Sequence, residues 1–292
     1  MDNSQVLTLE TGRKLGYAEY GAEGGNPVFY FHGYPGSRLE AGLMEDHWES
    51  SGIHLISVDR PGMGLSEYQP RRTILDTPDD VMELATHLGL ESYGVMGVSG
   101  GGPYALACAY KIPSDQIVGC AVISGSGPYH LTQEGLGKGE RYMLSIARNL
   151  PSAFGFLLWF QLGRNVGREE WWEKNYAGMT AGAPEPDERI LNDTRMKENI
   201  KVKTVEAFRQ GSRGLVHDFV LYSKDWGYEL NEIPAETRLH LFHGELDKNV
   251  PPHIARTVAD KIPHCVAKFY PDEGHMSVFV NRFNEIVSSV KG

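Results

Sequence analysis

The chain from residue 92 to residue 101 reads Ser92-Tyr93-Gly94-Val95-Met96-Gly97-Val98-Ser99-Gly100-Gly101, an apolar run followed by glycines. Such an apolar run is typical of a buried strand. Pro103 then favours a helix, because the fixed φ of proline suits a first helical turn. A sharp turn from strand to helix leaves little space beside Ser99, and Gly97 and Gly101 are the small neighbours that it requires. The pattern predicts a nucleophile elbow centred on Ser99.

The same glycine-rich turn could instead bind a phosphate or have no ligand. A phosphate loop ends in Lys followed by Ser or Thr, and Pro103-Tyr104 occupy that place. A dinucleotide-binding turn needs three spaced glycines and an acidic residue about twenty positions later. The serine interpretation is favoured by what accompanies Ser99 along the chain.

A second glycine-containing turn, His32-Gly33-Tyr34-Pro35-Gly36, follows the apolar run 27–30. Acyl transfer requires two backbone N–H donors for the oxyanion, one from the residue after the nucleophile and one from another loop. Gly100 supplies the first donor. Because Pro35 has no N–H, Tyr34 is the expected second donor.

Two later turns contribute an acid and a base. Asp247 ends a strand-like run, and Glu245 is the competing acid. Of the histidines beside a glycine at a strand end, His275 is the one that follows both the serine and the acid. The order serine, acid, histidine is the one associated with this elbow. We therefore expect Ser99 as the nucleophile, His275 as the general base and Asp247 as the acid that orients the imidazole.

Taken together, these motifs resemble the α/β-hydrolase fold family. The landmarks occur in the family's order: His32–Gly36, Asp59–Ser66, Gly97–Gly101, His243–Asp247 with Val250-Pro251, and Gly274-His275. The resemblance implies the same assignment, with Ser99, His275 and Asp247 as the triad and the Tyr34 and Gly100 amides as the oxyanion hole. Epoxide hydrolases and dehalogenases of the family carry Asp at the nucleophile position, so the serine argues against both activities.

Strand-like and helix-like runs alternate along the first part of the chain, which is typical of a mostly parallel sheet with helices on both faces. The expected strands are 5–9, 14–20, 28–31, 54–58, 93–98 and 117–124, and the expected helices include 39–49 and 77–88. The resemblance implies an eight-stranded α/β-hydrolase sheet with an inserted helical cap. We expect the core to comprise residues 1–126 and 234–292, and the cap residues 127–233.

The composition is that of a soluble enzyme of 292 residues, with 41% hydrophobic and 23% charged residues. A net charge of −10 argues against nucleic acid or an anionic membrane as a main partner. Cys108, Cys120 and Cys265 stand in apolar stretches and are expected to be free thiols. The sequence has no secretory-signal pattern and no apolar stretch of membrane-spanning length, so we expect a cytoplasmic protein.

The expected cap is rich in apolar residues, notably 153–160 and Trp171-Trp172. These side chains either attach the cap to the core or line a pocket for a small to medium apolar substrate. No motif indicates a cofactor or a metal ion, so none is expected. We predict a carboxylic ester hydrolase, as a monomer or a homodimer. A proline iminopeptidase-like aminopeptidase, a lactonase, a carbon–carbon bond hydrolase and an acyltransferase are alternatives on the same triad. A receptor for a small ligand is the alternative of another class.

Overall fold

A computed structural model describes residues 3–129, 131, 136 and 138–292 of the protein. These residues form one eight-stranded sheet, in the order β1-β2-β4-β3-β5-β6-β7-β8. Strand β2 is antiparallel to both of its neighbours, and all the other pairs are parallel. The predicted mostly parallel sheet is therefore confirmed. The strands are β1 (Gln5–Thr8), β2 (Lys14–Gly21), β3 (Asn26–Phe31), β4 (Ile53–Val58), β5 (Tyr93–Val98), β6 (Ile117–Ile123), β7 (Leu239–Gly244) and β8 (Val266–Tyr270).

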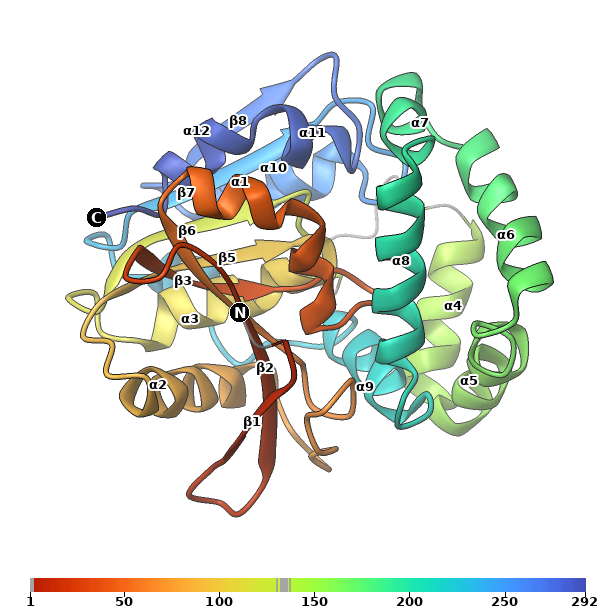
Figure 1. Ribbon diagram of the computed structural model, residues 1–292, viewed down its shortest axis with the longest axis horizontal. Helices are drawn as coiled ribbons and strands as arrows, with labels where there is room; N and C mark the ends of the chain where they lie inside the picture. The colour runs from red at the N-terminus through yellow and green to blue at the C-terminus, as the bar shows by residue number, and fades with distance from the viewer. Residues whose placement is uncertain (1–2, 130, 132–135, 137) are drawn as a thin grey trace.

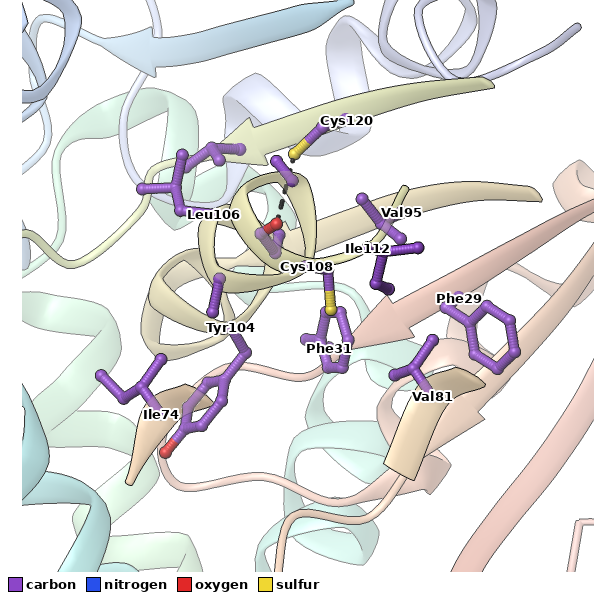
Figure 2. Packing of buried hydrophobic residues seen from close by; sticks show 14 of the residues in the cluster. Phe29, Phe31, Ile74, Val81, Val95, Tyr104, Leu106, Cys108, Ile112 and Cys120 are labelled. Carbon is purple, nitrogen blue, oxygen red and sulfur yellow. Dashed lines mark hydrogen bonds between the residues drawn. The ribbon is translucent and has the colours of Figure 1, made fainter. Parts of the chain in front are cut away.

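Helices cover both faces of the sheet (Figure 1). On one face, α2 (Thr77–His87), α3 (Gly102–Lys111) and α10 (Pro252–Lys261) bury their apolar side chains in a large cluster with β3 and β5. Figure 2 shows part of this cluster, with Phe29 and Phe31 of β3 beside side chains of α2 and α3. The opposite face carries a second cluster, built around Trp48 of α1 (Glu45–Ser50) together with α11 (Ser277–Asn281) and α12 (Phe283–Ser288). Strands buried on both faces explain the nearly continuous apolar runs in the sequence.

The segment expected to be one helix at 39–49 is divided in two. Residues Arg38–Met44 form a 3₁₀ helix, η1, whose first turn is capped by the Ser37 side chain. The α-helix α1 follows, beginning at Glu45. Spacings of three and four residues place nearly the same side chains on one face, so the apolar pattern does not distinguish the two helix types.

Between β6 and β7 the chain forms a group of helices that lies to one side of the sheet (Figure 1). We refer to residues 138–222 as the helical insertion. It contains α4 (Lys138–Asn149), α5 (Pro151–Leu158), the π-helix η4 (Trp159–Gly163), α6 (Glu169–Ala181), α7 (Glu185–Leu191), α8 (Thr194–Ala207) and α9 (Arg213–Tyr222). Helix α8 packs on η1 of the core. The insertion therefore contacts the core next to the turn that ends β3.

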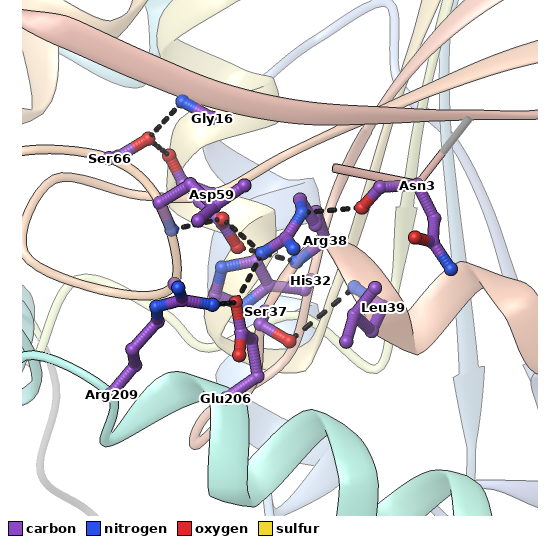
Figure 3. Close-up of polar contacts among 12 residues, drawn as sticks. Asn3, Gly16, His32, Ser37, Arg38, Leu39, Asp59, Ser66, Glu206 and Arg209 are labelled. Atoms are coloured by element: carbon purple, nitrogen blue, oxygen red, sulfur yellow. Dashed lines mark hydrogen bonds and ion pairs between the residues drawn. The ribbon is translucent and has the colours of Figure 1, made fainter. Parts of the chain in front are cut away.

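The loop Asp59–Ser66 is held by buried polar contacts (Figure 3). The Asp59 carboxylate pairs with the Arg38 guanidinium at 2.8 Å, and Arg38 also pairs with Glu206 of α8 at 2.7 Å. The Ser66 hydroxyl donates to the Asp59 carbonyl oxygen and accepts from the N–H of Gly16. These contacts fix the loop to both the sheet and the insertion. They explain Asp59 and Ser66 of the Asp59–Ser66 motif as structural residues, with no role in a reaction.

Candidate active site

Ser99 occupies a tight turn between β5 and α3. Its φ is 52°, in the left-handed region that a residue with a side chain rarely adopts. A Cβ atom on Gly97 would lie 2.4 Å from the Gly101 carbonyl oxygen, and one on Gly101 would lie 2.0 Å from the Phe31 carbonyl oxygen. Neither position accepts a side chain. The close packing of these backbones holds the strained serine at the start of α3.

Asp247 and His275 are joined by a hydrogen bond at the carboxyl ends of β7 and β8. Asp247 Oδ2 lies 2.8 Å from His275 Nδ1, while Oδ1 accepts the N–H groups of Asn249 and Val250 at 2.8 and 2.9 Å. The carboxylate is thus fixed by its own turn and presents one oxygen to the ring. This bond assigns the proton to Nδ1 and leaves the lone pair of Nε2 for a base.

Asp247 and His275 each stabilise the charged form of the other. Burial alone would lower the pKa of His275, but the charge and hydrogen bond of Asp247, followed by the charge of Asp187, raise it above its ordinary value. Burial would likewise raise the pKa of Asp247, whereas the charge and hydrogen bond of His275 lower it. The arrangement stabilises an imidazolium next to a carboxylate, as a general base requires after it accepts a proton.

The competing residues occupy other environments. Glu245 forms an ion pair with Arg256 at the surface. His243 is fully buried and bonds the Val250 carbonyl oxygen at 2.9 Å, with the same nitrogen 3.3 Å from Asp247 Oδ2. Burial lowers the pKa of His243, so this ring is neutral and supports the aspartate from within the core.

His32 is a structural histidine of the turn after β3. Its Nδ1 lies 2.8 Å from the Gly33 carbonyl oxygen. Burial, together with the charge of Arg60, lowers its pKa to about 3. The ring is fully buried, bonds its own turn and does not line the cavity at Ser99, so it is not placed to exchange a proton with a substrate.

The two expected oxyanion donors belong to loops that touch. A Cβ atom on Gly100 would lie 2.8 Å from Tyr34 Cβ, and one on Gly33 would lie 3.6 Å from Ser99 Cβ. The turn that ends β3 therefore lies directly against the serine turn. The start of a helix next to Gly100 also favours negative charge there.

Ser99 and His275 line one cavity of about 510 Å³. No hydrogen bond joins their side chains in the part of the chain that the structure describes; in such sites this bond often shortens only when a substrate is bound. The cavity walls come from both the core and the insertion and are mainly apolar, including Trp172, Tyr176, Met196, Ile200, Met276 and Phe279. Its size is that of a pocket for a small organic molecule.

One ion pair lies in the wall of this cavity. Glu40 Oε1 accepts the hydroxyl of Tyr30 and the N–H of Gly33, both at 2.8 Å, and Oε2 pairs with Lys203 of α8. Burial alone would raise the pKa of Glu40, but Lys203 is the main group that lowers it to about 2. The insertion thereby supplies the counter-ion of the residue that holds the Gly33 turn.

A second contact from the insertion reaches the loop of the candidate base. Asp187 of α7 is 3% exposed, and its Oδ2 accepts the N–H of His275 at 2.8 Å. Its Oδ1 accepts the N–H groups of Met276 and Ser277 at 3.0 and 2.9 Å. A Cβ atom on Gly274 would lie 2.4 Å from the same carboxylate, so the backbone can approach it only at a glycine.

A third contact reaches the turn after Ser99. The Tyr222 hydroxyl of α9 donates to the Gly100 carbonyl oxygen at 2.8 Å. Asp218, one turn earlier, pairs with the buried guanidinium groups of Arg60 and Arg72. Burial would raise the pKa of Asp218, but these two charges hold it well below its usual range. Arg60 therefore has a structural role.

Asp187, Lys203 and Tyr222 are the three anchors of the insertion: Asp187 holds the His275 loop, Tyr222 the turn after Ser99, and Lys203 the Glu40 carboxylate that accepts from Gly33. The sequence analysis did not identify any of them. Asp187 and His275 are 88 positions apart, and no local motif relates them. An alignment that showed paired changes at such positions would be the signal for them.

Three further observations concern metal binding, membrane-spanning helices and the cysteines. Within the described ranges, no three His, Cys, Asp or Glu side chains are grouped so that they could hold a metal ion. In the same part of the chain, no helix is long and apolar enough to cross a bilayer. The three cysteines are free thiols, as predicted.

Comparison with known sequences agrees with this architecture. Residues 26–282 match the family described as alpha/beta hydrolase fold. A probable proline iminopeptidase of Streptomyces coelicolor is 30% identical over 176 residues, which cover 52% of this chain and 54% of that protein. A putative proline iminopeptidase of Mycoplasma pneumoniae is 30% identical over 118 residues, 39% of this chain and 37% of that protein. The chain thus spans about half the length, or less, of these curated relatives.

Solved structures show the same fold over nearly the whole chain. The esterase of Exiguobacterium antarcticum superposes with a TM-score of 0.68 at 18% identity, covering 98% of each chain. The enol-lactonase of Burkholderia xenovorans gives a TM-score of 0.68 at 16% identity, covering 97% of this chain and 98% of that one. With the sequence match over residues 26–282, these findings confirm the predicted fold, and the chain belongs to the alpha/beta hydrolase fold family.

Proposed function

We propose that the protein is a carboxylic ester hydrolase that uses Ser99, His275 and Asp247 to cleave a small to medium apolar ester. One observation carries the proposal: His275, which is hydrogen-bonded to Asp247, and Ser99, held in a strained turn, border the same largely apolar cavity. The combination of a strained serine, an oriented imidazole and a buried acid is the arrangement that acyl transfer needs.

In the proposed reaction, Nε2 of His275 takes the proton of the Ser99 hydroxyl as the oxygen attacks the ester carbonyl carbon. The carbonyl oxygen becomes negatively charged and accepts hydrogen bonds from the Tyr34 and Gly100 N–H groups. His275 returns the proton to the leaving alcohol. Water, activated by the same ring, then releases the acid and restores the serine. Only groups of this chain and water take part.

The polar groups of the cavity favour an uncharged substrate over a peptide with a free amino terminus. A site for an ammonium group needs a carboxylate that is open to it. Glu40, the carboxylate in the wall beside the Gly33 turn, already accepts from Tyr30, Gly33 and Lys203. An aminopeptidase reaction, as in the iminopeptidase relatives, would require the substrate amine to displace Lys203. We therefore favour an ester or a lactone over an amide as the substrate.

The test begins with the mass of the intact protein after treatment with a fluorophosphonate, because this reagent reacts with an activated serine without presuming a substrate. We expect one adduct on the native protein and none on Ser99→Ala. p-Nitrophenyl esters of graded chain length, a simple lactone and proline p-nitroanilide are then compared at equal enzyme concentration. Faster turnover of the anilide than of the esters and the lactone would indicate an aminopeptidase instead of an esterase. The absence of any adduct would overturn the hydrolase and favour the ligand receptor.

A further inference from the structure

The insertion contains a second cavity, of about 650 Å³. It lies among α4, α5 and α9, which pack against one another (Figure 1), and it extends to the loop that contains Tyr68 and Arg71. None of its lining residues lines the cavity at Ser99. The proposed hydrolase reaction makes no use of this place.

Positive charge is concentrated around this second cavity. Arg71, Arg148, Arg213 and Lys224 line it, and its lining contains no Asp or Glu. None of these four side chains forms an ion pair with a carboxylate among the side chains that the structure describes. The whole chain carries a net charge of −10, so a cavity lined by cations without acids departs from its average surface. Such a place attracts anions.

Two exposed aromatic side chains also line the second cavity. Phe156 is 65% exposed and Trp159 44% exposed, and both line the cavity. Neighbouring exposed aromatic side chains of this kind can cover the apolar part of a ligand. Elsewhere in the lining, the Arg213 guanidinium lies 4.3 Å from the centre of the Tyr68 ring, a contact that holds the charge in place.

One further feature distinguishes Arg71. Its φ is 61°, in the left-handed region, where a non-glycine residue is strained. Strained residues of this kind are concentrated at ligand sites, because the surrounding structure must hold them in place. Strain, charge and aromatic surface thus meet at the same cavity.

We propose that this cavity is a second ligand-binding site, for a small anion that carries an apolar group, such as a carboxylate, sulfonate or phosphate monoester on an aromatic or alkyl chain. The cations bind the anionic group and the Phe156 and Trp159 rings cover the apolar part. A volume of about 650 Å³ suits one small molecule, which favours a free amphiphile over a planar lipid surface. The site goes beyond the proposed hydrolase reaction and does not depend on it.

The experiment uses 8-anilinonaphthalene-1-sulfonate as the anionic probe, followed by fluorescence and calorimetry. N-phenyl-1-naphthylamine, the same ring system without the sulfonate, is the neutral control. Both are titrated into the native protein and into protein whose Ser99 carries a fluorophosphonate adduct that fills the first cavity. We expect the sulfonate to bind the modified protein at one site and more tightly than the neutral probe. If Ser99 does not react, a two-site titration of the native protein gives the same comparison.

Variants locate the sulfonate site. Arg148→Gln and Arg213→Gln are each expected to weaken its binding about fivefold, the upper range for exposed charge pairs. Arg164→Gln is the matched control, because it removes one charge from the same insertion at a residue that stacks on Phe160 and does not line the cavity. Circular dichroism confirms that each variant is folded. The affinity for the neutral probe should remain unchanged in all three.

Three results would overturn the proposal. One is equal affinity for the neutral and anionic probes, which would mean that apolar contacts alone bind the probe and that the cations do not bind the sulfonate. Another is an equal loss of affinity in the Arg164 variant, which would mean a diffuse charge effect. The third is sedimentation with phosphatidylglycerol vesicles, but not phosphatidylcholine vesicles, that depends on Arg148 and Arg213 while the soluble probe does not bind. In that case the face binds a lipid surface and not a free anion.

Discussion

Replacing Asp187 by asparagine tests whether the insertion positions the candidate base. The native carboxylate accepts three N–H groups, those of His275, Met276 and Ser277. An asparagine can keep the two bonds made by Oδ1, but its amide NH₂ then faces the His275 N–H, donor against donor. The variant therefore loses the bond closest to the imidazole and keeps nearly the same volume.

The expected magnitude follows from that lost bond. A hydrogen bond to a charged acceptor contributes about 1.5–3 kcal/mol. If this energy serves to hold His275 where the transition state needs it, kcat/KM falls by about tenfold to hundredfold. The pH profile also changes. The Asp187 charge is one of the groups that raise the pKa of His275. Its removal lowers that pKa, so the acidic limb of the profile moves to lower pH.

The assay is hydrolysis of p-nitrophenyl butyrate between about pH 5 and about pH 9, where a histidine base titrates. Asp193→Asn is the matched control. Asp193 Oδ1 caps α8 by accepting the N–H groups of Arg195 and Met196, so this variant removes the same charge from the same insertion without contacting His275. We expect a modest loss of stability and an unchanged pH profile for the control.

Two results would refute the reasoning. In the first, Asp187→Asn keeps the native kcat/KM and the native acidic limb, which would make the three hydrogen bonds irrelevant to the base. In the second, both Asp variants lose activity equally, with identical pH profiles and equally reduced urea midpoints. That outcome would leave Asp187 as a residue of general stability only.

Further predictions concern the other contacts around the cavity. Tyr222→Phe removes the hydroxyl that donates to the Gly100 carbonyl oxygen, and we expect kcat for the ester to fall about fivefold with KM unchanged; an equal change in both would argue against positioning. Gly101→Ala places a Cβ atom 2.0 Å from the Phe31 carbonyl oxygen, and urea unfolding should show a loss of more than about 3 kcal/mol, or no folded protein. The pKa of Glu40 is about 2 in the folded protein instead of 4.5, so its ionised form stabilises the fold above about pH 4.5. This contribution should disappear as the pH falls from about 4.5 towards about 2, and Glu40→Gln should flatten that part of the stability curve; an unchanged curve would contradict the role of the Lys203 pair.

The central part of the sheet could be predicted because β3, β4, β5 and β6 are largely buried and therefore appear as short apolar runs. The candidate site could be predicted from the sequence for a related reason. Ser99, Asp247 and His275 each follow the end of a strand, and parallel strands bring their carboxyl ends to one edge. Local motifs and the expectation of a mostly parallel sheet were thus sufficient to suggest which loops meet. Their proposed roles in catalysis still depend on the experiments above.

The anchors of the insertion could not be predicted in this way. Asp187, Lys203 and Tyr222 lie on separate helices, and each contacts a residue far away in the sequence. A charged residue on a helix looks in sequence like any solvated side chain, because its burial depends on how that helix packs. The 3₁₀ helix at Arg38–Met44 was missed for a local reason, since its apolar spacing also fits an α-helix.

The three anchors have a consequence for how this fold can be recombined. A graft of foreign helices between β6 and β7 would replace more than the walls of the pocket. It would also remove the acceptor of the His275 N–H, the donor to Gly100 and the counter-ion of Glu40. Chimeras that exchange the insertion alone would therefore change the pocket walls and also lose these three contacts to the candidate site. Keeping them requires Asp187, Lys203 and Tyr222 at the equivalent positions of the new helices. In the proposed hydrolase, selectivity and turnover would therefore change together.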